Sequence, residues 1–329
     1  MNRTIAITKS LAAVLLAILI FSTGAWASQV FIDDGLDIYN YIPLTNPPGS
    51  TLQNAFAAYN GQVTGLAFSY NNPSPVLFVA AINANEIFEY TLAGVPTPFA
   101  AVSTPVGLAV SAAGNIYTSE NDNELVELGT NGSQLNTSAS GLAVDSLVVN
   151  GAGDVFEADD SSHDINEYSP TLGSLGVYAT GLPGSTYYGM AFDNAGDLFV
   201  SFQGSGGAGG GIVEISPTGS ASTVYNMPGN TNAPTGLAFD PVSSNLYMIY
   251  DSFGGGTGGA DVFSVSSNGT FDATAGVYVA AGSIDDPYSI AVLIPEPGTF
   301  ALAGFGLISI ALFHFRRMRG GRVAELVRD

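Results

Sequence analysis

Two kinds of residue are missing from most of this 329-residue chain. Cysteine is absent altogether, and no lysine or arginine occurs between Ser10 and Phe315. Without cysteine the chain has no disulfide bond, no thiolate nucleophile and no cysteine-based zinc site. Stability must therefore come from packing. With 46% hydrophobic residues, one large domain can bury a sufficient core without covalent cross-links.

Positive charge is confined to the two ends of the chain, where the seven basic residues are Arg3, Lys9, Arg316, Arg317, Arg319, Arg322 and Arg328. By contrast, 25 of the 28 acidic residues lie between Asp33 and Asp286. Such an acidic body repels nucleic acid and anionic lipid, so we expect no nucleic-acid partner. The acidity is compatible with divalent cations or neutral sugars as ligands, and it also simply keeps a protein soluble.

The N-terminal residues 1–27 have the pattern of a secretory signal peptide. Arg3 and Lys9 precede an apolar run over 11–21, which is followed by the small-residue motif of Ala25 and Ala27. Cleavage after Ala27 by signal peptidase would leave Ser28 as the mature N-terminus. The alternative is an uncleaved signal anchor, against which the short apolar run argues.

The C-terminal residues 294–329 form a second signal. Pro295, Glu296 and Pro297 precede an apolar run over 300–315, and Arg316, Arg317 and Arg319 follow it. This order resembles the PEP-CTERM sorting signal of Gram-negative bacteria. The run is barely long enough to cross a bilayer, and the arginines would hold its end in the cytoplasm. We therefore expect a single transmembrane sorting helix.

The PEP-CTERM resemblance implies a route and a destination. It implies export through the Sec translocon, transient retention in the inner membrane, and cleavage by an exosortase near Pro295 to Pro297. The mature protein would then reach the outer surface or extracellular matrix. The family usually ends soon after its arginines, whereas this chain continues with residues 320–329. That extra tail keeps open the alternative of a plain tail anchor.

Between the two signals, residues 28–293 repeat one phrase. It opens six times, at Gly65, Gly107, Ser146, Gly189, Gly236 and Ser289, in steps of 39 to 53 residues. Steps of this size are typical of the four-stranded blades of a β-propeller. The phrase continues with a turn whose fourth residue is glycine, as at Gly114, so it predicts a β-hairpin. A third strand follows in each repeat, with acidic residues such as Glu127 alternating outward.

The register of the third repeat is ambiguous, because Gly141 also fits the opening of the phrase. We prefer Ser146, since Gly153 then falls at the same offset as in neighbouring repeats.

The sixth repeat lacks its later strands, and the start of the body supplies them. Segments 29–34, 36–41 and 51–56 have the patterns of second, third and fourth strands, while 289–293 would be the innermost strand. Pairing of these segments closes the ring without a free edge. The sequence therefore predicts an all-β, six-bladed propeller.

The repeated phrase resembles NHL repeats and their six-bladed relatives, the SMP-30/gluconolactonase and streptogramin-lyase-like propellers. The resemblance covers about residues 28–293 and implies fold far more than activity. Streptogramin-lyase chemistry relies on histidines, and His163 is the single one in this body. Gluconolactonase relatives hold a divalent metal with Glu, Asn and Asp, but those ligands cannot be assigned to residues of this chain.

Carboxylates are the remaining candidates for a site. They occupy loops between second and third strands, at Asp33, Asp34, Glu120, Asp122, Asp159, Asp160 and Asp251. Closure of the ring would bring Asp33 and Asp34 into one blade with Asp285 and Asp286. Such oxygen ligands are those that Ca²⁺ takes, so these four residues are a candidate metal site. The alternative is that they are solvated acids in loops.

Two glycine-rich stretches, 204–209 and 254–259, formally match a dinucleotide-binding motif. Such a site needs a helix after the glycines, and here a strand is expected each time.

The sequence thus predicts a secreted, monomeric, non-catalytic propeller at the cell surface or in the matrix. It would bind a polysaccharide or a surface protein. One alternative is a Ca²⁺-dependent lactonase or hydrolase, and another is a passive structural matrix protein.

Overall fold

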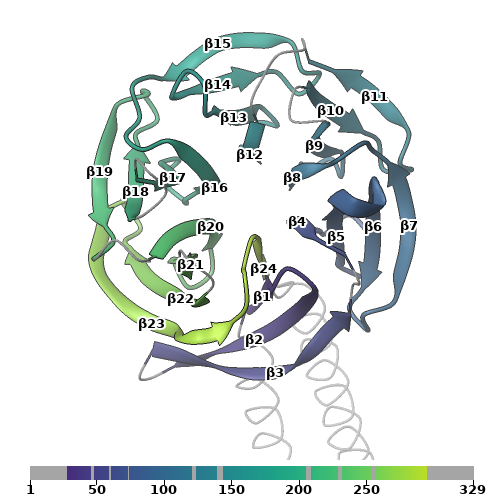
Figure 1. Ribbon diagram of the computed structural model, residues 1–329. Coiled ribbons are helices and arrows are strands. Elements are labelled where there is room, and N and C mark those ends of the chain that lie inside the picture. The colour runs from purple at the N-terminus through teal and green to yellow at the C-terminus, as the bar shows by residue number, and fades with distance from the viewer. Residues whose placement is uncertain are drawn as a thin grey trace, which may run out of the picture. The chain divides into compact units, whose positions relative to one another are not determined.

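The sequence repeats fold into six four-stranded antiparallel sheets that stand radially around a central axis (Figure 1). The computed structural model of the protein describes residues 28–45, 48–58, 61–72, 74–120, 124–138, 144–204, 209–228, 232–252 and 256–294. The all-β, six-bladed fold is therefore confirmed. The signal peptide and the sorting helix lie outside the described residues. Within the described ranges, no helix is long and apolar enough to span a membrane.

Strands at the same position in the six blades are equivalent, and each blade contributes one strand to every position. The innermost strands are β24 (Ile290–Leu293), β4 (Val63–Ser69), β8 (Val106–Val110), β12 (Val144–Val149), β16 (Thr186–Phe192) and β20 (Asn232–Asp240). The second strands are β1 (Gln29–Asp33), β5 (Val76–Ala81), β9 (Ile116–Glu120), β13 (Val155–Asp159), β17 (Leu198–Gln203) and β21 (Asn245–Ser252).

The outer half of each blade is built in the same way. The third strands are β2 (Asp37–Thr45), β6 (Glu86–Thr91), β10 (Glu124–Leu128), β14 (Asp164–Tyr168), β18 (Gly210–Ile215) and β22 (Gly256–Val265). The outermost strands are β3 (Pro48–Ala58), β7 (Pro96–Ala101), β11 (Gln134–Thr137), β15 (Ser174–Ala179), β19 (Ala221–Asn226) and β23 (Phe271–Ile284). A short 3-10 helix, η1 (Ile82–Ala84), joins β5 to β6.

The predicted hairpins form because their turns suit the repeated residues. In the turn between β8 and β9, Gly114 has φ +88°, which is a conformation that side chains rarely adopt. Its N–H donates to Ser111 O at 2.9 Å, and Asn115 N donates to Ser111 Oγ at 3.2 Å. Gly153 repeats this conformation with φ +94°. Ser146 pairs with Ala158, so the register chosen for this repeat is also confirmed.

The two ends of the body close the ring as predicted. β24 pairs with β1 in antiparallel register, from Gln29 opposite Leu293 to Ile32 opposite Ile290. The resulting sheet has the order β24-β1-β2-β3 (Figure 1). Closure pairs the edges that both ends would otherwise leave open.

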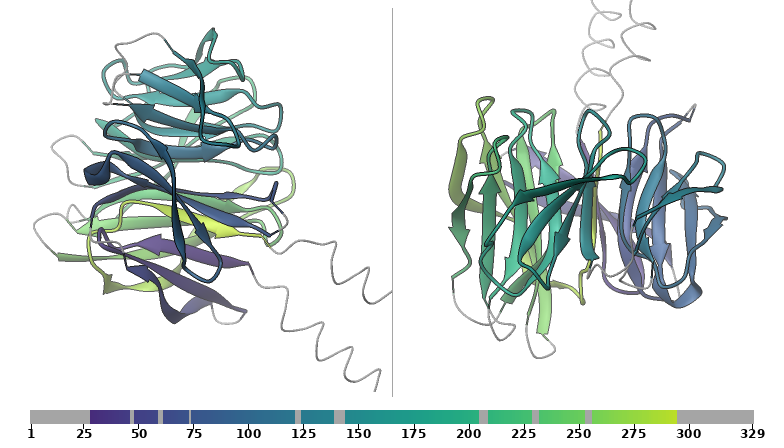
Figure 2. Two further views of the ribbon diagram at one scale, coloured as in Figure 1. Left: turned by 90° about the vertical axis from the view of Figure 1, so that its right-hand side faces the viewer. Right: turned by 90° about the horizontal axis from the view of Figure 1, so that it is seen from above.

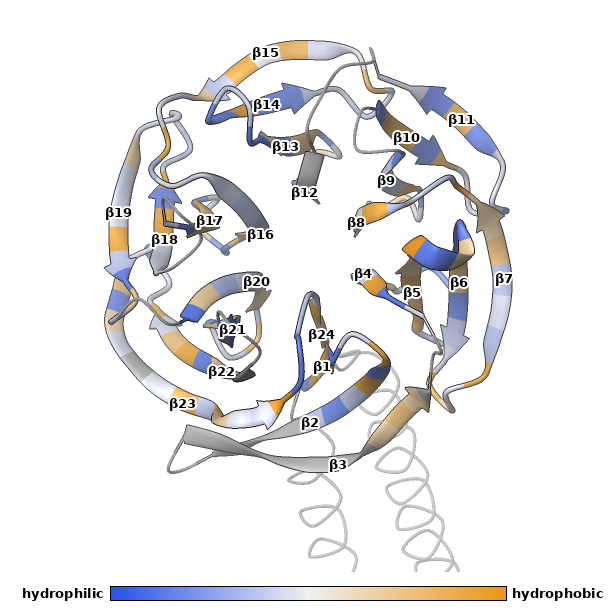
Figure 3. Cartoon of the chain, viewed as in Figure 1, coloured by the Kyte–Doolittle hydropathy of each residue, from blue (hydrophilic) through white to orange (hydrophobic). Residues whose placement is uncertain are grey.

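The hydrophobic core lies between the blades. Six clusters of buried residues are present in the described structure, one at each interface between neighbouring blades. Each blade contributes a buried aromatic residue from the same position of its second strand, namely Phe31, Phe78, Tyr117, Phe156, Phe199 and Tyr247. Towards the rim, hydrophobic and hydrophilic residues alternate along strands such as β11 and β15 (Figure 3).

One expectation about the third strands is wrong. Glu127 was expected to point outward, but it is only 3% exposed. Its Oε1 accepts an N–H from Asn115 at 2.7 Å and its Oε2 one from Asn136 at 2.5 Å. The two amides satisfy the carboxylate and so allow its burial.

The strands run between two faces of the propeller, which Figure 2 shows from the side. We call one the loop face, because it carries the connections from second to third strands and from blade to blade, such as 34–36 and 285–289. The other is the turn face, which carries the hairpin turns, such as 111–115 and 241–244. Any functional site built from loops belongs to one of these faces.

Candidate functional site

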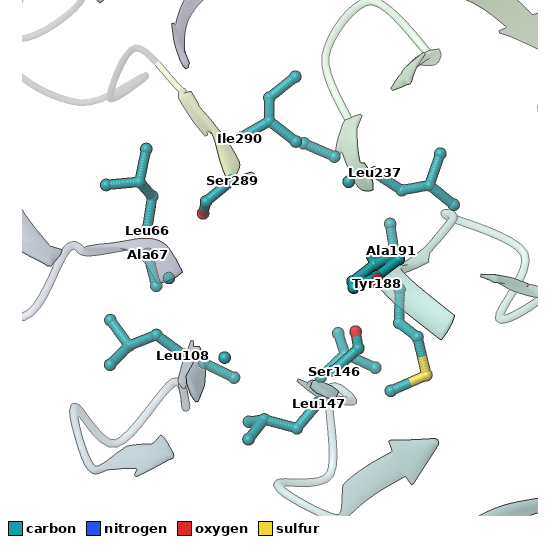
Figure 4. A pocket seen from close by; sticks show the side chains of 18 of the residues that line it. Leu66, Ala67, Leu108, Ser146, Leu147, Tyr188, Ala191, Leu237, Ser289 and Ile290 are labelled. Atoms are coloured by element: carbon teal, nitrogen blue, oxygen red, sulfur yellow. The ribbon is translucent and has the colours of Figure 1, made fainter. Parts of the chain in front are cut away.

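The innermost strands surround a central cavity of about 320 Å³. Its wall includes Leu66, Leu108, Leu147 and Leu237 from four different blades (Figure 4), whose side chains are only 5–8% exposed because they pack between the blades. Hydroxyl groups interrupt this wall, and those of Ser146 and Ser289 point into the cavity (Figure 4). A concave site with convergent polar groups is a usual place for a ligand.

Bulges in the innermost strands alter which side chains meet the cavity. In four blades the register shifts just before the Gly or Ser of the repeated phrase, between Val63 and Gly65, Val144 and Ser146, Tyr187 and Gly189, and Pro234 and Gly236. Such a bulge re-aims the extra residue. Thr64 and Tyr188 are extra residues of this kind, and both line the cavity.

A second tyrosine occupies the equivalent position in the closing blade. Tyr288 directly precedes Ser289 and also lines the cavity. Because each innermost strand starts at the loop face, Tyr188 and Tyr288 both lie toward the loop-face end of the channel. We call this end, with Thr64, Ser146, Tyr188, Tyr288 and Ser289, the channel mouth. Sequence reasoning missed it, although both tyrosines stand one residue before the opening of the phrase.

The channel is narrow because its strands approach closely. A Cβ added at Gly189 would overlap the backbone nitrogen of Leu237 in the next blade. At Gly65 it would lie 2.9 Å from the Cβ of Leu108. The small opening residue of the repeated phrase therefore lets neighbouring innermost strands pack side by side.

The predicted convergence of acids in the closing blade is present, but the carboxylates have structural partners. Asp33 is fully buried, and its Oδ1 accepts N–H groups from Gly35 and Tyr288, each at 3.1 Å. Burial raises the pKa of Asp33 to about 8, and Oδ2 has no hydrogen-bond partner among the described residues. Asp34 Oδ1 accepts N–H groups from Leu36 at 3.2 Å and Asp37 at 2.6 Å.

Asp285 and Asp286 lie in the connection that leads to β24. A Cβ added at Gly35 would lie 3.7 Å from the Oδ2 of Asp286, so these loops are adjacent. Burial, then the charge of Asp285, raises the pKa of Asp286. No three histidine or acidic side chains of the described ranges form a group that could hold a metal ion. The Ca²⁺ site at Asp33, Asp34, Asp285 and Asp286 stays a prediction.

Three of the other loop-face acids accept backbone N–H groups, one within its own loop and two from another segment of the chain. Glu120 accepts an N–H from Ser103 at 3.2 Å, Asp159 one from Ser161 at 2.8 Å, and Asp160 one from Tyr187 at 3.0 Å. Asp122 lies outside the described residues. Glu120 lies on the blade of β8–β11, whereas Asp159 and Asp160 lie together on the blade of β12–β15.

His163 is also built into its loop. It adopts φ +59°, and its Nδ1 lies 3.1 Å from the hydroxyl oxygen of Tyr187. The backbone oxygen of His163 accepts an N–H from Leu182 at 3.0 Å. This arrangement orients the ring against a buried tyrosine.

Glu157 is a buried acid that the sequence pattern did not single out. Its side chain is fully buried, and Oε2 accepts a hydrogen bond from Asn166 at 3.0 Å, whereas Oε1 has no partner among the described residues. Burial raises its pKa to about 7. A comparison of the repeats could have found it, because Val79, Val200 and Met248 occupy the equivalent position in other blades.

The glycine-rich stretches lead into strands, as expected. β18 begins at Gly210 and β22 at Gly256, so neither stretch precedes the helix that a dinucleotide site requires.

Solved structures of similar fold include enzymes of different chemistry. A gluconolactonase from Xanthomonas campestris has a TM-score of 0.52 and 15% identity, over 74% of this chain and 81% of its own. The PQQ-bound aldose sugar dehydrogenase from Streptomyces coelicolor has a TM-score of 0.58 and 15% identity, over 73% and 88%. Virginiamycin B lyase from Staphylococcus aureus has a TM-score of 0.52 and 12% identity, over 83% and 94%. At these identities the likeness establishes the fold alone.

The C-terminal segment matches a known family by sequence. Residues 293–317 match the PEP-CTERM protein-sorting motif, which implies export and exosortase-dependent sorting to the cell envelope. No curated protein sequence matches the chain. The chain thus joins a six-bladed propeller, resembling the gluconolactonase in fold, to a PEP-CTERM protein-sorting motif.

Proposed function

We propose that this protein is a non-catalytic binding propeller of the cell surface or extracellular matrix, which takes a neutral saccharide at the channel mouth. The observation that carries the proposal is the pair Tyr188 and Tyr288, which line the loop-face end of the cavity together with the hydroxyls of Ser146 and Ser289 (Figure 4). Aromatic rings offer an apolar face with a polar edge, and hydroxyls both donate and accept hydrogen bonds. A sugar presents the complementary combination of C–H faces and hydroxyl groups.

Charge supports a neutral ligand. The body carries no lysine or arginine, and Asp251 and Asp286 lie close enough to Tyr288 to raise the pKa of its hydroxyl, after the larger effect of burial. An anionic polysaccharide would meet negative potential at this mouth. Neutral sugars do not suffer this repulsion.

The absence of an assembled catalytic set among the described residues is the reason to favour binding over turnover. His163 is engaged by Tyr187, and the most strongly perturbed carboxylate, Asp33, is fully buried and tied to the backbone. A general acid or base must reach the substrate proton, directly or through one water. Neither group lines the cavity.

A glycan array probed with the mature protein released from producing cells tests the proposal. We expect retention by neutral glycans and none by uronic-acid or sulfated glycans. Retention by anionic glycans alone, or by no glycan, would contradict it, and the second result would favour a passive structural role. Turnover of lactones or glycosides that requires Ca²⁺ would favour the hydrolase instead.

A further inference from the structure

The two ends of the propeller leave it at the same face. β1 runs from Gln29 at the turn face to Asp33 at the loop face, and β24 runs back from Ile290 to Leu293. Gln29 and Leu293 are direct partners in this pairing. Both Ser28 and Ile294 therefore emerge at the turn face.

The channel mouth lies at the opposite end of the same strand pair. Tyr288 N donates to Oδ1 of Asp33, the last residue of β1, at 3.1 Å. Asp33 N in turn donates to Ser289 O at 3.2 Å. The hydrogen bonds that close the ring at the loop face thus fix Tyr288 beside the channel, away from the chain ends.

The sorting segment starts inside the closing strand. The PEP-CTERM match begins at residue 293, which is the last residue of β24. The six residues 294–299, which lead to the apolar run, span at most about 22 Å when fully extended. A domain of this size has a radius of gyration of about 18 Å, so the tether is shorter than the diameter of the body. A body held by so short a tether cannot invert so that its loop face meets the membrane.

We propose that the protein, while held through its C-terminal segment, presents the loop face outward and keeps the turn face against the cell envelope. The ligand of the outward-facing loop face is the neutral saccharide of the proposed function. This part of the inference rests on the proposed function. The orientation itself depends only on where the chain leaves the propeller and on the sorting motif.

The orientation also distinguishes between two hollows of the molecule. The turn face carries a polar hollow of about 700 Å³ between the blades of β4–β7 and β8–β11, lined among others by Ser69, Asn71, Asn72, Glu89 and Thr130. Its size and polar groups would suit a sugar as well. The proposed orientation covers this hollow in the attached protein and leaves the channel mouth open.

Because the chain has no cysteine, variants with one introduced cysteine can test the orientation. Leu36 on the loop face is 63% exposed and Val242 on the turn face is 61% exposed, so Leu36→Cys and Val242→Cys are matched single-thiol variants of the full chain. Each is treated with a maleimide carrying a polyethylene glycol chain of about 5 kDa, in opened cell envelopes and after solubilisation in detergent. The reaction rate is read from the gel shift.

We expect Leu36→Cys to react at the same rate in both states, and Val242→Cys to react at least fivefold more slowly in envelopes. Equal rates for Val242→Cys in the two states, or protection of Leu36→Cys in envelopes, would overturn the orientation. The glycan array fails or succeeds independently of these rates. A negative array with the expected labelling would therefore refute the saccharide and keep the orientation.

Discussion

At the scale of single residues, the small opening residue of the repeat has a packing function. Gly189 lies where the innermost strand β16 meets β20, and no side chain fits between them. Gly151 offers a contrast, because a Cβ added there would meet nothing within 4 Å. The two glycines thus separate the effect of close packing from that of losing a flexible residue.

We expect Gly189→Ala to lower the free energy of unfolding by about 1–3 kcal/mol, because the added methyl group must displace backbone. Gly151→Ala should change it by about 0.5 kcal/mol or less. Urea denaturation of both variants measures the difference. Equal stabilities would show that the strands do not approach as described.

Buried acids should make the stability of this protein depend on pH. The pKa of Glu157 rises from 4.5 to about 7 on folding, so between these values the folded state holds a proton that the unfolded state releases. Stability should therefore fall as pH rises through this window, with Glu157 contributing about 3 kcal/mol to the fall. Below pH 4.5 both states are protonated, and the group contributes no slope.

Glu157→Gln cannot titrate and keeps an oxygen or nitrogen at each position of the carboxylate. We expect its stability to fall less steeply between pH 4.5 and 7 than that of the unmodified protein. Thermal denaturation across this range measures both slopes. An unchanged slope in the variant would mean that Glu157 is ionised in the folded state throughout.

At the scale of elements, ring closure is the feature on which the propeller depends. The pairing of β1 with β24 joins residues about 260 positions apart, and it is the contact that turns an open row of blades into a ring. Any agent that fixes this pair should stabilise the whole body, because it removes much of the freedom of the unfolded chain.

We expect the double substitution Gln29→Cys with Leu293→Cys to form a disulfide on export and to raise the free energy of unfolding by about 3–5 kcal/mol. The control pair Glu89→Cys with Thr97→Cys also joins direct partners, in β6 and β7, but closes a short loop. It should stabilise by about 2–3 kcal/mol less. Denaturation with and without reductant measures both, and failure of the first disulfide to form would contradict the closure.

Much of the arrangement of strands and blades was predictable from the sequence, because the sequence is periodic. The glycine turns, as at Gly114 and Gly153, and the alternating strands specify hairpins locally. Three strands at the N-terminal end of the body and one at its C-terminal end then leave one way to close the ring. Bulges are different, because no residue type marks where the extra residue falls. Tyr188 therefore could not be assigned to the channel from its sequence neighbours.

Burial of acids escaped prediction for a related reason. Whether a glutamate in a half-buried strand points to solvent depends on its partners in other strands. Glu127 finds Asn115 and Asn136, and Glu157 finds Asn166, only once the blades are assembled. The loop acids at Asp33 and Asp286 were correctly placed in one blade, because the predicted closure brings their loops together.

At the scale of the whole molecule, the two proposals assign different roles to the two faces. Both chain ends leave the body at the turn face, to which we assign attachment, whereas the loop face carries the channel mouth, which we propose as the binding site. An acidic body without basic residues would then keep anionic polymers away from the mouth. Sorting, orientation and ligand charge are consistent with a surface protein that binds neutral saccharide.

The most direct test of this account is calorimetric titration of the mature protein with a neutral oligosaccharide that the array retains. We predict that Tyr188→Ala and Tyr288→Ala each weaken binding by at least tenfold. The control Leu175→Ala, at a 58% exposed side chain on the outer strand β15, should bind like the unmodified protein. Unchanged affinity in both tyrosine variants, with their folding intact, would contradict the assignment of the channel mouth as the binding site.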